Sequence, residues 1–129
     1  MKTASLTAAA ALVFMATPAF ATSTFLCQST ISPTDGPRLW LTVGGAPGSG
    51  VVQARLEMGD RRFTTGEGQS APAIGQSWLD RNSLRLTIVD ANAENEIVRL
   101  EAWRRTGASY RGSLRYAGRT WQVRCAEEG

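Results

Sequence analysis

A regular alternation of polar and apolar residues over the last quarter of the chain is the feature that most constrains its fold. Between Ile97 and Cys125, arginines alternate with aliphatic and aromatic residues in three segments, which are separated by the turn sequences Thr-Gly-Ala and Ala-Gly. Because successive side chains of a β-strand point to opposite faces, this pattern predicts strands with one face in a core and one in solvent. We therefore expect three consecutive antiparallel strands at the C-terminus.

The same alternation recurs toward the N-terminus, and no segment shows a helical period. In residues 51–58 it predicts that Val52, Ala54, Leu56 and Met58 face the core. Gly59-Asp60 fits a two-residue hairpin connection, whereas the glycine-rich segments 44–50 and 66–75 read as loops. Short strands with frequent turns are typical of a small antiparallel barrel or sandwich. The sequence predicts an all-β fold of about eight strands.

The first 21 residues have the organisation of a secretory signal peptide. Lys2 supplies a positive charge, residues 4–16 form an apolar run, and Ala19-Phe20-Ala21 fits a cleavage site. The apolar run is shorter than the roughly 20 residues that a bilayer-spanning helix needs. We expect cleavage after residue 21, a single domain over residues 22–129 without a transmembrane segment, and a periplasmic or secreted protein.

Two cysteines, Cys27 and Cys125, stand near the two ends of this predicted domain. In a small exported chain, two cysteines are typical of one disulfide. The bridge would join the first strand to the last and close the barrel or sandwich. The alternative is a pair of buried free thiols.

The residues that usually carry catalysis or bind metals are scarce. The chain has no histidine, which removes the commonest general base and zinc ligand. Most of its 11 acidic residues stand in or beside predicted turns. Neither lysine nor a helix start follows the glycine-rich segment 44–50, as a phosphate-binding loop would require. We expect no enzyme, cofactor or metal site, and a hydrolase that uses paired carboxylates is the remaining catalytic alternative.

Arginine is concentrated in the C-terminal strands. Seven arginines and one acidic residue, Glu101, lie between Ile97 and Cys125. If the strands pair in sequence order, five of these arginines share one outer face: Arg99, Arg111, Arg115, Arg119 and Arg124. Such a face would attract an anionic partner, for example a cell-envelope component such as acidic polysaccharide or lipid phosphate, nucleic acid, or an acidic protein. The alternative is a polar face that only keeps the sheet soluble.

Two tryptophans are out of phase with the apolar residues of their own strands. Trp40 and Trp103 therefore fall on the predicted outer face, whereas Tyr110 and Trp121 fall on the core face. Trp103 also precedes two arginines, and an exposed tryptophan beside arginines is a candidate recognition site. The candidate ligand-binding residues are Arg99, Trp103, Arg104, Arg111, Arg115 and Arg119.

In its small size, its all-β strand pattern and its predicted closing disulfide, the chain resembles the bacterial periplasmic lysozyme inhibitors and small lipocalin-like barrels. This resemblance implies a protein target, with loop 44–50 or loop 66–75 entering the active-site cleft of a cell-wall hydrolase. A basic surface would repel a basic lysozyme, so the target would be an acidic enzyme. The first hypothesis is a non-catalytic exported protein that holds an anionic or amphipathic ligand on the arginine-rich face or in a barrel mouth, and the inhibitor is the second.

Overall fold

The computed structural model describes residues 22–45 and 50–128, so the predicted signal peptide lies outside the described residues. The described residues form nine strands and contain no helix, hence no helix that could span a membrane. The strands are β1 (Ser23–Ser29), β2 (Arg38–Val43), β3 (Val51–Met58), β4 (Arg61–Thr64), β5 (Ala73–Leu79), β6 (Ser83–Val89), β7 (Glu96–Trp103), β8 (Tyr110–Tyr116) and β9 (Arg119–Glu128).

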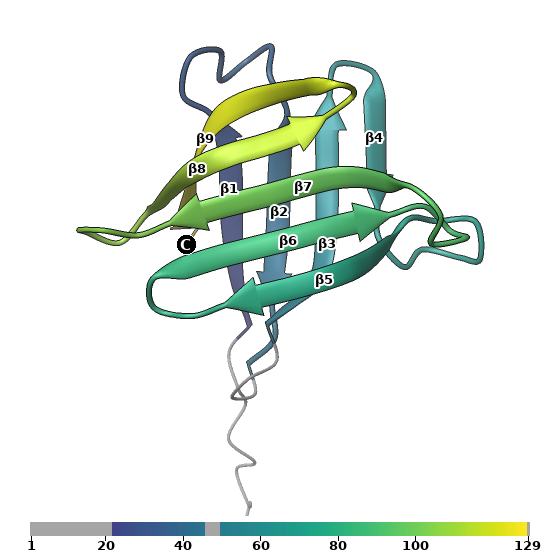
Figure 1. The fold of residues 1–129 in the computed structure, drawn as a ribbon, viewed down its shortest axis with the longest axis horizontal. Helices are drawn as coiled ribbons and strands as arrows, with labels where there is room; N and C mark the ends of the chain where they lie inside the picture. Colours follow the sequence, from purple (N-terminus) through teal and green to yellow (C-terminus); the bar gives the residue numbers. More distant parts are fainter. Residues whose placement is uncertain (1–21, 46–49, 129) are drawn as a thin grey trace, which may run out of the picture.

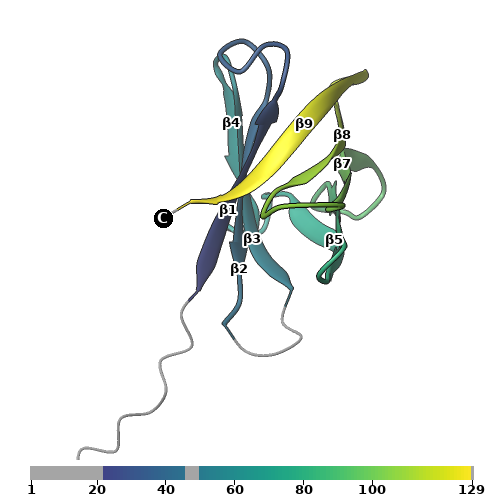
Figure 2. The same ribbon diagram turned by 90° about the vertical axis from the view of Figure 1, so that its left-hand side faces the viewer.

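All nine strands belong to one antiparallel sheet with the order β4-β3-β2-β1-β9-β8-β7-β6-β5. The sheet curls into two layers whose strands cross steeply, with β5–β8 in front of β1–β4 (Figure 1). Strand β9 runs obliquely between the layers (Figure 2) and turns the corner, as strands of orthogonally packed sheets do. The prediction of a small all-β fold is confirmed, and its form is a curled half-barrel.

Cys27 and Cys125 are bonded to each other, as predicted. They are direct partners in the β1–β9 ladder, with Cα atoms 3.9 Å apart, and both are fully buried. The bridge therefore joins the first and last strands at the corner between the two layers.

Apolar side chains of both layers fill the space between them. The largest fully buried ones are leucines, among them Leu39, Leu41, Leu86 and Leu100. Each such side chain stabilises the fold by roughly 2 kcal/mol through burial. Tyr110 lies edge-on to Phe25 with ring centroids 6.0 Å apart, and Trp121 is partly buried against the core, so both aromatic residues face inward as expected.

The predicted inward face of β3 is wrong at one position. Val52 is 55% exposed and Val51 is buried instead. The β2–β3 register shifts between Thr42 and Val43, where an irregularity pairs Val43 with Val51. An extra residue in one strand reverses the faces beyond it, so simple alternation fails at this point.

Strand β5 begins earlier than the sequence suggests. Residues 73–75 belong to the strand, although they were expected in the loop 66–75. The β5–β6 register shifts between Ile74 and Gln76, around Gly75. This irregularity interrupts the alternation and hides the start of the strand. Strand β5 also meets the other layer, because the Val51 N–H donates to Ser77 Oγ at 2.9 Å.

Candidate functional site

The outer face of β7–β9 carries two cross-strand pairs of arginines. Arg111 of β8 is the direct partner of Arg124 of β9, and Arg99 of β7 is the direct partner of Arg115 of β8. All four side chains are exposed. Directly opposed residues have Cβ atoms about 5 Å apart, so each pair places two positive charges side by side. The predicted shared face is thus observed for these four arginines.

The two pairs differ in how their charge is compensated. Arg99 forms an ion pair with Glu96, with Nη2 and Oε2 2.8 Å apart, and this contact raises the pKa of Arg99. Within the described part of the chain, neither Arg111 nor Arg124 has a carboxylate within ion-pair distance. Arg124 instead donates from Nε to Ser109 Oγ at 3.3 Å. The pair Arg111–Arg124 therefore keeps its positive charge available to a ligand.

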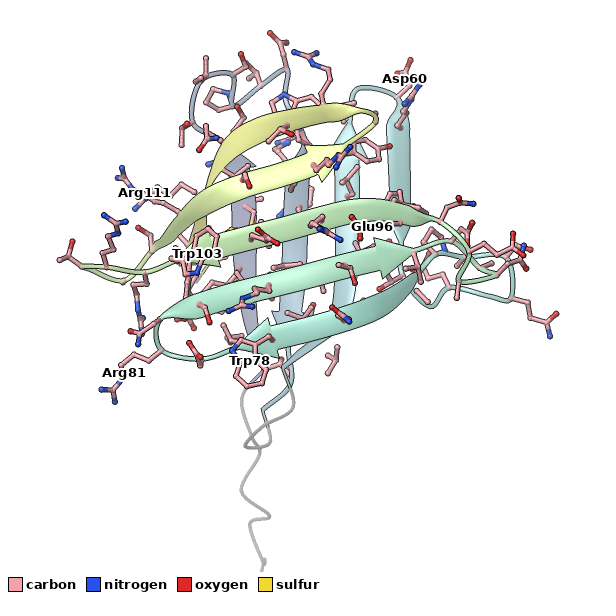
Figure 3. The ribbon with its side chains drawn as sticks, viewed as in Figure 1. Asp60, Trp78, Arg81, Glu96, Trp103 and Arg111 are labelled. Atoms are coloured by element: carbon pink, nitrogen blue, oxygen red, sulfur yellow. A yellow bond between two sulfur atoms is a disulfide. The ribbon has the colours of Figure 1, made fainter. Side chains whose placement is uncertain are left out.

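Beside this uncompensated pair is an open cleft of about 1030 Å³, and Trp103 and Arg111 are among the residues that line it. Trp103 is 46% exposed and lies opposite Arg111 in the β7–β8 ladder. Figure 3 shows the two labelled side chains at the same end of the front layer. Arg104 and Arg105 line the cleft with the neutral polar residues Asn82, Thr106, Ser109 and Gln122. We call this depression the Trp103 cleft.

The backbone of the Trp103 cleft is tied to the neighbouring β5–β6 turn. The Arg104 N–H donates to the carbonyl of Asn82 at 2.8 Å, and the Tyr110 hydroxyl donates to the carbonyl of Asp80 at 2.7 Å. The guanidinium group of Arg104 lies 5.2 Å from the centroid of the Tyr110 ring. These contacts orient Arg104 at the edge of the cleft, where a cation–π contact adds to the backbone bond.

A second exposed tryptophan, which the sequence did not single out, lies on the same outer face. Trp78 is 59% exposed, and its Nε1 donates to Asp80 Oδ2 at 2.9 Å. Asp80 Oδ1 accepts from the backbone N–H groups of Asn82 and Ser83 at 2.8 and 2.7 Å. The bond from Trp78, followed by these backbone bonds, lowers the pKa of Asp80 to about 2. The sequence signal was a tryptophan two residues before a turn aspartate at the end of a strand.

The structure separates Arg119 from the other predicted arginines. Arg119 pairs with Tyr116 across the Ala117-Gly118 turn, so it lies on the side of the sheet to which the buried Tyr116 points. Its guanidinium group is 4.9 Å from the centroid of the Trp121 ring. The expectation that Arg119 shares the outer face is wrong, because a two-residue turn puts the residues that flank it on one face.

Trp40 also lies on the outer face, as expected, but on the other layer of the sheet. The guanidinium groups of Arg38 and Arg55 are 5.4 and 4.4 Å from its ring centroid. These arginines of the chain itself contact the indole. Trp40 is therefore a weaker candidate for ligand stacking than Trp78 or Trp103.

The outer face therefore presents two kinds of group to a ligand, namely the charged hydrogen-bond donors of arginine and the exposed indole rings of tryptophan. In residues 22–45 and 50–128, no group of three or more cysteine, aspartate or glutamate side chains could hold a metal ion. Of the two loops predicted to enter a protein target, residues 46–49 of the first lie outside the described residues. The second loop is exposed from Gly66 to Ser70. Its two ends are joined by a hydrogen bond in which the Gly66 N–H donates to the Pro72 carbonyl at 3.0 Å.

Comparison with known proteins identifies no relative of this chain. No protein-family model matches the chain, and no curated protein or solved structure matches it either.

Proposed function

We propose that this chain is a non-catalytic exported binding protein that holds an anionic ligand on the outer face of its C-terminal strands. The observation that carries the proposal is the Trp103 cleft, where an exposed indole lies beside the uncompensated pair Arg111–Arg124. Guanidinium groups bind carboxylates and phosphates through paired, charge-assisted hydrogen bonds. The indole adds an apolar surface for the uncharged part of the ligand.

The outer face is a better location than a barrel mouth. The side chains that point between the two layers form one contiguous apolar cluster, which includes Leu56, Leu84 and Leu114. An anion placed among them would lose its hydration without gaining a donor. The non-catalytic part of the proposal is supported by the absence of histidine from the sequence.

The test is a binding panel with three anionic probes, namely polygalacturonate, phosphatidylglycerol vesicles and oligothymidylate, and uncharged dextran as the neutral probe. The variant Arg111→Ala/Arg124→Ala should bind the preferred anion at least about tenfold more weakly, because interface arginines often contribute more than about 1 kcal/mol each. Binding should also weaken as salt is added.

The matched control is Arg61→Ala/Arg62→Ala, which removes two exposed charges from the edge strand β4, neither of which lines the Trp103 cleft. It should change affinity much less than the Arg111/Arg124 variant. Equal losses of affinity in the two variants would show that binding depends only on the net charge of the protein. The absence of binding to every anionic probe would refute the proposal.

Inhibition of a cell-wall hydrolase is the second candidate function. The exposed connection between β4 and β5 supports it, because a compact loop that carries one charged side chain, Glu67, has a shape suited to a cleft. Replacing residues 67–71 by a shorter linker should abolish inhibition of a captured hydrolase. The same replacement should leave anion binding at the Trp103 cleft intact.

A further inference from the structure

A second depression lies on the outer face, next to the Trp103 cleft. It has a volume of about 380 Å³, and Trp78, Arg85 and Glu101 are among the residues that line it. Arg85 is the direct partner of both Trp78 and Glu101, so these three side chains form one row across β5, β6 and β7. Trp103 is two residues beyond Glu101 and therefore on the same face. We call this depression the Trp78 groove.

The two exposed indoles are spaced as two contact points for one extended ligand. Two strand spacings across the sheet and two residues along β7 separate their Cα atoms by roughly 12 Å. Figure 3 shows both tryptophans on the front layer toward the same end of the sheet. The Trp103 cleft and the Trp78 groove can therefore be occupied at once by a linear molecule that crosses β6.

The Trp78 ring is held in place before any ligand arrives. Its indole N–H is bonded to Asp80, whose other oxygen is fixed by the Asn82 and Ser83 backbone. The Trp78 side chain is 59% exposed. The hydrogen bonds that orient it therefore do not improve the packing of the core. Fixing a ring in advance reduces the entropy lost on binding, which favours recognition.

The polar side chains around the two indoles indicate the chemistry of the ligand. Gln76, Thr87 and Ser113 stand on the same face and supply neutral donors and acceptors. Glu101 shares a cross-strand row with Trp78, is two residues from Trp103 on β7, and forms no ion pair among the described residues. Its carboxylate accepts hydrogen bonds from hydroxyl groups. Every ring of an oligosaccharide carries hydroxyl groups that can donate to this carboxylate, whereas the backbone of a DNA strand carries none.

From this juxtaposition we propose that the Trp103 cleft and the Trp78 groove form one track for a linear acidic oligosaccharide. This inference rests on the proposed function and specifies its ligand. Sugar rings have an apolar face of C–H groups that stacks on an indole, and their hydroxyls pair with Glu101 and the neutral side chains. The carboxylates of the oligosaccharide would lie against Arg111, Arg124 and Arg85, where charge complementarity favours them.

The experiment measures affinity by calorimetry for galacturonate oligomers of increasing length, neutral cello-oligomers of the same lengths and an oligothymidylate. In the wild type, galacturonate affinity should rise with length until the oligomer reaches both tryptophans, and the neutral oligomers should bind at least about tenfold more weakly. Trp78→Ala should lower the affinity of long oligomers about tenfold and leave short ones unchanged, whereas Arg111→Ala should weaken every length.

Trp40→Ala is the matched control, since it removes an outer-face tryptophan from the other layer and should leave all affinities unchanged. If Trp78→Ala does not fold, Trp78→Phe serves as the second variant. Phenylalanine keeps a flat ring, so this variant should retain part of the dependence of affinity on oligomer length. Unchanged long-oligomer affinity in a folded Trp78→Ala protein, with weaker binding in Arg111→Ala, would overturn the track but keep the proposed function. Tighter binding of oligothymidylate that depends on Trp78 would overturn the saccharide assignment.

Discussion

Arg111 and Arg124 face each other directly across β8 and β9 on the exposed side of the sheet, and neither has a carboxylate partner among the described residues. Like charges at directly opposed positions destabilise an antiparallel sheet. A local cost of this kind is expected where a surface serves binding rather than stability. The pair Arg99–Arg115 shows the contrast, because Glu96 compensates it.

Replacing one arginine of the uncompensated pair should stabilise the fold. Arg111→Thr removes the repulsion and places a good strand former at an exposed position, so the unfolding free energy should rise by about 0.5 kcal/mol. Urea unfolding measures this change. Arg115→Thr is the control and should give a smaller gain because its partner is already paired with Glu96. A destabilised Arg111→Thr protein would contradict the repulsion between the two guanidinium groups.

Removing the disulfide should lower stability substantially. The bridge spans a sequence separation of 98 residues. On the chain-entropy model, a loop of this length contributes about 4 to 5 kcal/mol. The variant to test is Cys27→Ala/Cys125→Ala. Alanine is preferred to serine because serine would place hydroxyl groups at two fully buried positions. Its denaturation midpoint should fall far below that of the oxidised protein, and equal midpoints would show that the closure of the two terminal strands adds no stability.

The hydrogen bonds of Asp80 should make the stability of the fold sensitive to acid. Because folding lowers the pKa of Asp80 from 3.8 to about 2, its carboxylate stabilises the fold above pH 3.8, and this contribution disappears as the pH falls toward 2. Asp80→Asn should therefore have a lower melting temperature than the wild type at pH 7, and the difference should close between these two pH values.

Asp60→Asn is the control for this prediction, since Asp60 lies in the β3–β4 turn and makes no side-chain hydrogen bond among the described residues. Its melting temperature should follow that of the wild type at every pH. A gap between Asp80→Asn and the wild type that persists unchanged at pH 2 would show that the effect does not come from the ionised carboxylate.

Gly112 should not accept a side chain. A Cβ atom at this position would lie 2.6 Å from the Cα of Ala102 and would also meet the carbonyl oxygen of Glu101. Strand β8 would have to move away from β7, so Gly112→Ala should lower the unfolding free energy by at least about 2 kcal/mol. Ser113→Ala changes the neighbouring outer-face position and should stay within about 0.5 kcal/mol of the wild type. Thermal unfolding of the two variants distinguishes them, and equal stability would disprove the close approach.

Part of the candidate site could be predicted from the sequence, because the alternation of polar and apolar residues shows directly which side chains point to the outer face of the sheet. Trp103 follows the buried Ala102, and Arg111 follows the buried Tyr110, so the outward positions of both residues follow from period two. The position of Arg119 could not be obtained in this way, since it depends on how many residues form the turn before it. The reversal at Val51 and Val52 likewise depends on a bulge that alternation does not encode.

Side-chain periodicity and the number of cysteines can be read directly from the sequence, so they were enough to predict an antiparallel β-fold and a single disulfide that closes it. Which outward-facing residues become neighbours depends instead on how the strands pair in the folded sheet. The pairing of Arg111 with Arg124 and the row from Trp78 through Arg85 to Glu101 depend on cross-strand register. Register is set by turn lengths, bulges and the packing of the whole curled sheet, so the binding face appears only when all of the strands are in place.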